Sequence, residues 1–142
     1  MSQYERSTES TATPDQVWEL WSNTNTWPRW NPDVRDISLD GSFQSGTTGS
    51  MTSRAGTHSI RLENVFAGRS FDLVTSPIPA TTFRFHCEVT PHGVGSRLSQ
   101  SVSMSGLMAP LMSRMMGKRV AAGFQPLLDG LAKEAESRVT VS

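Results

Sequence analysis

The stretch MAPLMSRMMGKRVAAGFQPLLDGLAKEAE, residues 108–136, decides the fold, because it is the only long run of helix-forming residues in the chain. At about 100° per residue, its second half places apolar side chains on one face at spacings of three and four. The members of this stripe are Val120, Phe124, Leu127, Leu128, Leu131 and Ala135. We therefore expect a long C-terminal helix that buries this face against the rest of the protein.

The first half of the same stretch carries a second apolar stripe, rotated by roughly 140° from the first if the helix is straight. Its members are Met108, Leu111, Met112, Met115 and Met116. A straight helix cannot bury both stripes on one surface, so we expect a bend near Gly117 or near Pro126. The simplest interpretation is ordinary core at a kinked helix. Since methionine adapts to varied shapes, the alternative is packing on a ligand, at a cavity mouth or against a second subunit.

Length and charge exclude several classes of protein. The 142 residues fit a single domain, 1–142, whose core needs neither disulfides nor metal. The 13 basic and 13 acidic residues leave no net charge to favour nucleic acid. Met1–Ser10 is too polar for a signal peptide, and no apolar run approaches the ~20 residues of a membrane span. We expect a cytoplasmic protein with no membrane span.

The N-terminal third predicts one strand and two short helices. Residues 4–11 form a weak strand pattern. Thr13-Pro14-Asp15-Gln16 is a helix start, with threonine as N-cap, proline in the first turn and glutamine positioned to close a capping box. Residues 27–32, WPRWNP, predict a short helical turn between two corners.

From Val34 to Met104 the apolar period changes to two, which predicts strands over 34–39, 48–54, 58–66, 70–75, 82–90 and 97–104. A sheet with one apolar face needs a cover, and the C-terminal helix is long enough to provide it. The predicted class is α+β: a curved antiparallel sheet of about six to seven strands around a long C-terminal helix, with two short helices after the first strand.

Four motifs carry a family resemblance. They are TPDQVWELW at 13–21, WPRWNPDV at 27–34, LDGSFQSGTTG at 39–49 and SGLMAPL at 105–111. Together they resemble the START-like polyketide cyclase and dehydrase superfamily (SRPBCC), from about Ser7 to Glu136. The resemblance implies a helix-grip fold whose cavity, between the helix and the concave sheet, holds a lipophilic molecule. Similar proteins carry apolar residues where this chain has Thr8 and Ser10.

Side-chain direction along the strands selects the candidate site. We expect ligand contacts from inward aromatic, methionine and polar residues: Trp27, Trp30, His58, Phe83, Phe85, Gln100, Met104, Met108, Met112, Met115 and Phe124. Alternation also places Asn64 and Phe66 inward and Cys87 in the core. We expect the outward charged residues to form a solvated cross-strand ladder and not an acid/base cluster. These residues are Arg61, Glu63, Arg84, His86, Glu88 and Arg97.

Three functions fit these observations. The first is binding or carrying a hydrophobic, lipid- or polyketide-like small molecule. The second is a polyketide aromatase or cyclase, which would depend on His58 with Gln100 or a tryptophan; the shortage of inward charged residues weighs against it. The third is a protein-interaction module, with a homodimer formed through the methionine-rich helix end. The sequence assigns no catalytic residue, no metal site and no cofactor.

Overall fold

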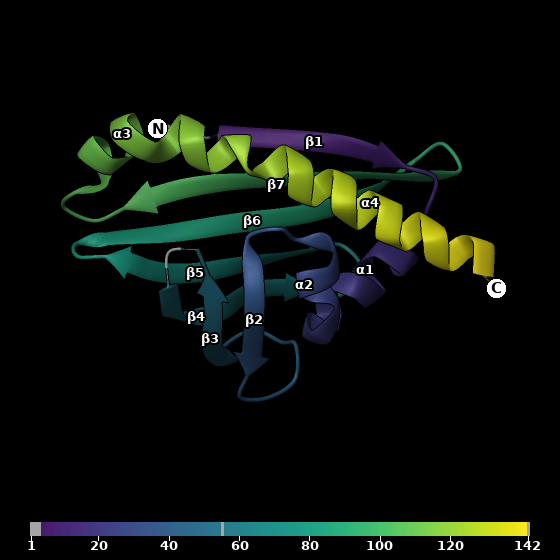
Figure 1. Cartoon of the computed structure of the whole chain (residues 1–142), viewed down its shortest axis with the longest axis horizontal. Coiled ribbons are helices and arrows are strands. Elements are labelled where there is room, and N and C mark those ends of the chain that lie inside the picture. Colours follow the sequence, from purple (N-terminus) through teal and green to yellow (C-terminus); the bar gives the residue numbers. More distant parts are fainter. Residues whose placement is uncertain (1–3, 55, 142) are drawn as a thin grey trace.

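Seven antiparallel strands form one open sheet, and two consecutive helices lie across one of its faces (Figure 1). The computed structural model describes residues 4–54 and 56–141. The spatial order of the strands is β1-β7-β6-β5-β4-β3-β2. Their bounds are β1 Tyr4–Ser10, β2 Val34–Leu39, β3 Thr48–Ser53, β4 Gly56–Phe66, β5 Ser70–Ile78, β6 Thr81–His92 and β7 Gly95–Ser105. Every strand predicted from the sequence is confirmed, with boundaries shifted by three residues at most.

The short helices follow β1 as predicted. Helix α1, Pro14–Ser22, begins with the expected capping box: the Gln16 amide donates to Thr13 Oγ1 over 3.3 Å, and the Thr13 amide donates to Gln16 Oε1 over 2.8 Å. A 3₁₀ turn, Thr24–Thr26, leads into the single turn of α2, Trp27–Trp30. These helices close one end of the space between the sheet and the C-terminal helices (Figure 1).

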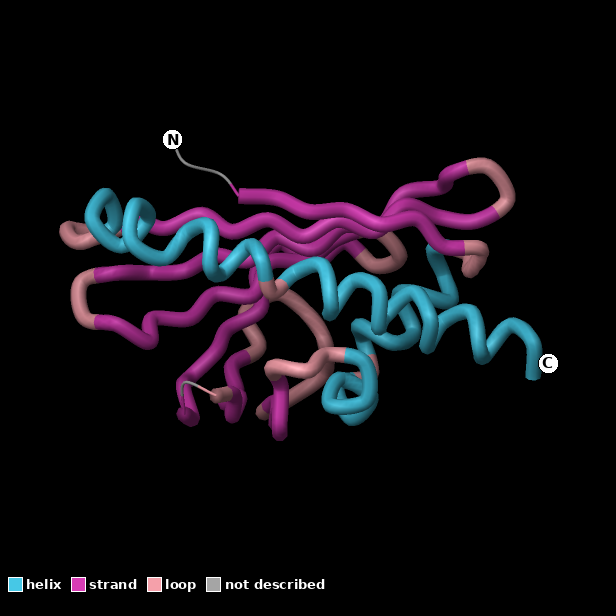
Figure 2. The backbone as a smooth tube through the Cα atoms, turned by 45° about the horizontal axis from the view of Figure 1, so that its top comes forward, coloured by secondary structure: helices cyan, strands magenta, loops and turns pink. Residues whose placement is uncertain are grey.

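The C-terminal helix is broken into α3, Ala109–Ala122, and α4, Phe124–Val141, which follow each other along the sheet (Figure 2). Of the two predicted locations for the bend, Gly117 and Pro126, the break at Gly123 lies nearer to Pro126. Pro126 has no amide hydrogen to donate to the carbonyl of Ala122, and its ring would clash with that carbonyl in a continuous helix. In the first turn of a new helix the missing donor costs nothing. The helix therefore ends one turn before the proline.

Helix α4 buries the predicted stripe, from Phe124 at 3% exposure to Ala135 at 0%. Its polar edge explains the unusual hydroxyls of β1. Thr8 donates to Asp129 Oδ1 over 3.0 Å, and Ser10 donates to Glu136 Oε2 over 2.9 Å. The residues that depart from the family pattern therefore bind the helix and do not line a polar cavity wall.

Helix α3 contradicts the interpretation of the methionine stripe as ordinary core. The residues that it buries are small ones at intervals of four: Ala109, Ser113, Gly117 and Ala121. Met112 and Met116 are half-buried, whereas Met108, Leu111 and Met115 are exposed. The reason is close approach: a Cβ on Gly117 would lie 2.1 Å from the Tyr4 ring, so the glycine lets the helix sit directly on β1.

A β-bulge in β4 reverses the predicted direction of two side chains. The pairing of β4 with β5 shifts register between Glu63 and Phe66, and Asn64 adopts a φ of 50°. Glu63 and Asn64 consequently both contact groups on the outer face of the sheet. Phe66, predicted to face inward, is 62% exposed. Strict alternation fails here because the bulge adds one residue to the strand.

Candidate functional site

A cavity of about 310 Å³ lies between the concave face of the sheet and the junction of α3 with α4. Strands β5, β6 and β7 provide its floor through Phe71, Leu73, Phe85, Cys87 and Gln100. Helices α3 and α4 cover it with Val120, Phe124 and Leu127, and α1 and α2 wall one end with Trp21, Trp27 and Trp30. The volume is at the lower end of the range of about 300–1,000 Å³ that small-molecule sites occupy.

Trp27 and Trp30 present ring faces, not hydrogen-bond donors, to the cavity. Trp27 Nε1 donates to the Trp21 carbonyl over 3.0 Å, and Trp30 Nε1 donates to Thr26 Oγ1 over 3.1 Å. Both indoles are 4% exposed and their rings pack at a centroid distance of 5.6 Å. Since both of these indole N–H groups are already paired within the protein, Trp27 and Trp30 offer an occupant apolar contact alone.

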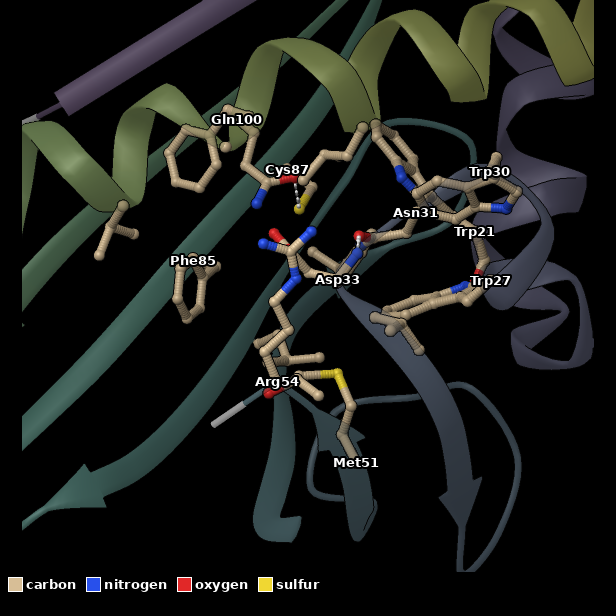
Figure 3. Close-up of a pocket in the computed structure, with 18 of the residues that line it drawn as sticks. Trp21, Trp27, Trp30, Asn31, Asp33, Met51, Arg54, Phe85, Cys87 and Gln100 are labelled. Carbon is tan, nitrogen blue, oxygen red and sulfur yellow. Dashed lines mark hydrogen bonds and ion pairs between the residues drawn. The ribbon is translucent and has the colours of Figure 1, made fainter. Parts of the chain in front are cut away.

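Gln100 is the polar group of the cavity floor (Figure 3). The Cys87 thiol donates to its Oε1 over 3.5 Å, which is the only hydrogen bond that the Gln100 side chain makes with the described residues. Burial raises the pKa of the Cys87 thiol, so the sulfur keeps its proton and remains a donor. This bond fixes the orientation of the amide, because Oε1 must face the sulfur. The Nε2 group is left as a donor to the cavity.

Charged side chains gather at the mouth. Arg54 Nε lies 3.7 Å from Asp33 Oδ1, with side-chain exposures of 78% and 48% (Figure 3). Arg119, at the end of α3, also borders the opening. Asp33 approaches the helix break, since a Cβ on Gly123 would lie 3.3 Å from its Oδ2. The cavity is therefore apolar inside and charged at its rim.

The structure brings five of the predicted site residues together around this cavity: Trp27, Trp30, Phe85, Gln100 and Phe124. The other six lie outside it: His58, Phe83, Met104, Met108, Met112 and Met115. His58 is half-buried on β4 opposite Met51, which does line the cavity. Phe83 pairs with Met104 further along β6 and β7, beyond Phe85. Met108 and Met115 are exposed, and Met112 is half-buried two turns before Val120, because the start of α3 packs on the sheet through its small residues.

Several lining residues escaped sequence reasoning. Trp21, Phe71 and Leu73 lie on faces whose periodicity marks them as buried, which does not distinguish a cavity wall from solid core. The rim residues Asp33, Arg54 and Arg119 come from a loop, a strand end and a helix end. No periodic pattern brings these three together, so only the fold identifies them.

The convex face of the same sheet carries a network of charged side chains. At its centre Asp72, 5% exposed, accepts from Arg84 Nη1 and from Asn64 Nδ2 over 2.9 Å each. Its Oδ1 lies 2.6 Å from His86 Nδ1. Glu63, Arg61 and Glu88 extend the network. The outward direction predicted for Arg61, Glu63, Arg84, His86 and Glu88 is confirmed, whereas Asn64 was predicted to face inward and joins them through the bulge. The network is partly buried and paired, not a ladder of fully solvated charges.

These contacts shift pKa values toward the charged forms. Burial by itself would raise the pKa of Asp72, but the hydrogen bonds from Asn64, His86 and Arg84 outweigh it and lower the pKa. Burial likewise acts to lower the pKa of His86, yet its contacts with Glu88 and Asp72 raise the pKa overall. Hydrogen bonds from Arg84 and Arg61 lower the pKa of Glu63. The Asp72 and Glu63 carboxylates, held in their charged forms in this way, stabilise the sheet and are poorly suited to accept a proton near neutral pH.

Among residues 4–54 and 56–141, no three His, Cys, Asp or Glu side chains are grouped so that they could hold a metal ion. Over the same residues, no helix has the length and apolar character needed to cross a bilayer.

Comparisons with known proteins agree with this architecture. Residues 1–136 match the family model described as polyketide cyclase / dehydrase and lipid transport. No curated protein matches the sequence. A solution structure from Thermobifida fusca superposes with a TM-score of 0.77 at 23% identity, covering 95% of this chain and 93% of that one.

Two further solved structures are similar at lower identity. The protein TTHA0849 of Thermus thermophilus has a TM-score of 0.74 at 12% identity, with 96% of this chain and 99% of that chain covered. A norcoclaurine synthase point mutant from Thalictrum flavum, in complex with a transition state analogue, has a TM-score of 0.75 at 13% identity, with coverages of 96% and 95%. Identities this low show the fold alone.

The seven-stranded sheet, the bent C-terminal helix and the cavity between them define a START-like protein with the helix-grip fold. Within that superfamily, the chain belongs to the polyketide cyclase / dehydrase and lipid transport family.

Proposed function

We propose that this protein binds and carries a hydrophobic small molecule that has one hydrogen-bond acceptor, such as a carbonyl oxygen. The observation that carries the proposal is the cavity itself. Its interior is walled by aromatic and aliphatic side chains, and on its floor the one amide, that of Gln100, has an Nε2 donor with no partner among the described residues. Mostly apolar walls with a few placed polar groups suit an apolar ligand held in one orientation.

The family description names both enzymes and lipid transport, and the composition of the site supports a carrier more than an enzyme. Cyclisation of a polyketide-like substrate needs a proton acceptor beside the reacting carbon. His58, the predicted base, lies outside the cavity, and Asp33 is the only carboxylate among the described residues that line it. Asp33 sits at the rim, half-exposed and close to Arg54. Turnover of a polyketide-like substrate that is lost in Asp33→Asn, while ligand binding persists, would favour the cyclase alternative.

The donor role of Gln100 is tested with two probes of nearly equal shape, 2-acetylnaphthalene and 2-isopropylnaphthalene. The first presents a carbonyl oxygen and the second does not. Binding is followed by titration calorimetry. We expect Gln100→Leu to weaken binding of the ketone about tenfold and to leave the hydrocarbon within about twofold, since one net hydrogen bond is removed. Gln44→Leu, at an exposed loop position, is the matched control.

Native mass spectrometry of protein purified from its own host provides an independent test. We expect a bound apolar molecule that is released on unfolding. Failure of both probes to bind, together with ligand-free protein in that experiment, would refute the carrier proposal. Equal weakening of both probes by Gln100→Leu would refute the hydrogen bond but not the cavity.

A further inference from the structure

Helix α3 is packed the opposite way from an ordinary surface helix. It turns its small residues toward the sheet, and Tyr4 of β1 reaches across Gly117 to donate a hydrogen bond to the Ser113 carbonyl over 3.3 Å. Several large apolar side chains are left on the outside, while Met112 and Met116 are half-buried. A typical amphipathic helix buries that class of residue.

The exposed side chains form one patch, which we call the α3 outer face: Leu107 at 91% exposure, Met108 at 39%, Leu111 at 48% and Met115 at 62%. These are four of the six large hydrophobic residues exposed in the described part of the chain. The other two, Phe66 and Val94, lie elsewhere, at the end of β4 and in the β6–β7 turn. Single exposed apolar residues are common, but a group of four within nine residues marks an interaction surface.

Cations flank the patch on both sides. With about 100° per residue, Arg114 and Lys118 lie on one side of Leu111 and Met115, and Arg119 lies on the other. All three cations are exposed, and none forms an ion pair with a described residue. No Asp or Glu occurs between Glu88 and Asp129, so nothing in this segment balances the positive charge.

This chemistry identifies the partner. An apolar stripe flanked by Lys and Arg is complementary to the boundary between acyl chains and anionic headgroups. It is a poor match to a second copy of the same face, because a symmetric pair would bring the same three cations together. We propose that the α3 outer face docks on an anionic lipid bilayer, with Leu107, Leu111 and Met115 entering the headgroup boundary.

Docking through this face also orients the cavity. Arg119 belongs both to the cationic edge of α3 and to the rim of the cavity, so a membrane bound there lies next to the mouth. A route between bilayer and cavity would follow, but the docking proposal stands on the α3 outer face alone. It does not depend on the function proposed above.

The test is co-sedimentation of the full chain with vesicles of phosphatidylcholine alone and with phosphatidylglycerol added. We expect binding that rises with the phosphatidylglycerol content and falls at high salt, because screening weakens the attraction. Arg114→Glu should weaken binding about fivefold or more, the effect of one cation near an anionic surface. Met115→Glu should weaken it at least as much.

The matched control is Phe66→Glu, which places the same charge at another apolar position of the same 62% exposure. It should bind vesicles like the unchanged protein. Light scattering and circular dichroism on each variant report mass and folding. The proposal would be overturned if vesicle binding did not depend on the phosphatidylglycerol content. It would also be overturned if Met115→Glu and Phe66→Glu weakened binding equally. A dimer that Met115→Glu dissociates would overturn it too, and would assign the face to a second copy of the chain.

Discussion

The two faces of the sheet are made by alternate residues of the same strands, yet their chemistry differs completely. Along β5 and β6, Phe71 and Phe85 turn to the concave side while Asp72 and Arg84, one residue away, turn to the convex side. On the concave face, the Nε2 donor of one amide has no partner among the described residues. On the convex face the carboxylates, guanidinium groups and imidazole of the network are all paired with one another. The charged network therefore maintains the sheet, and the open hydrogen-bonding capacity of the cavity lies among apolar side chains.

The largest effect should come from truncating the concave face. Phe71 is 1% exposed and its ring packs against Trp18, Trp21 and Phe43 at 5.0 to 6.1 Å between centroids. Phe71→Ala should lower the free energy of unfolding by about 3–5 kcal/mol in a urea titration. Phe66→Ala, at a phenylalanine that is 62% exposed, should change the free energy of unfolding by no more than about 0.5 kcal/mol. Equal losses in both variants would contradict the placement of the core.

The next largest effect should come from the centre of the convex network. Asp72→Ala removes the acceptor shared by Arg84, Asn64 and His86. We expect it to lower the free energy of unfolding by about 1–2 kcal/mol at pH 7. Arg61→Ala is the control, since its side chain is 52% exposed and such a pair contributes less than about 1 kcal/mol. If Arg61→Ala proved the more costly change, Asp72 would not be the centre of the network.

A smaller effect is expected at Cys87, which orients Gln100 from the floor of the cavity. Cys87→Ala should cost about 1 kcal/mol of stability. Because burial raises the pKa of this thiol, a thiol reagent should modify the native protein far more slowly than the unfolded one at pH 8. Rapid labelling of the native state would show that the sulfur is open to solvent and does not hold the amide.

The smallest effect is the pH dependence set by His86. Its pKa is raised in the folded state, so its contacts stabilise the protein fully below the unfolded pKa of about 6.5 and stop doing so as pH rises through the folded pKa. Asp72 and Glu63, with lowered pKa values, act in the opposite direction: their contribution is present above about pH 4 and is lost as pH falls through their folded pKa values.

The network should therefore be most stabilising between about pH 4.5 and 6.5. His86→Gln should flatten the decline in unfolding free energy from about pH 6 to 8, by less than about 1 kcal/mol because the His86 side chain is 42% exposed and screened. Urea titrations across this range provide the measurement. An unchanged pH profile would mean that His86 does not titrate in the network.

Local patterns predicted most of the fold. The capping box at Thr13, the alternation from Phe83 to Val89 and the buried stripe from Phe124 to Ala135 each depend on neighbours a few residues away, and each is confirmed. The failures have specific causes. The bulge at Asn64 reversed the direction of Phe66, and Gly117 let α3 approach Tyr4 so closely that Met108 and Met115 were left exposed.

The amino-acid sequence by itself determined the class of fold, the family and the division of each strand into an apolar and a charged face, because periodicity is a property of consecutive residues. Tertiary structure alone decided which apolar residues enclose the cavity, since Trp30, Gln100 and Phe124 meet only when α2, β7 and α4 converge. It also decided that Met115 faces solvent and not the cavity. Both outcomes depend on how closely two elements approach, which is set by contacts between residues far apart in the chain.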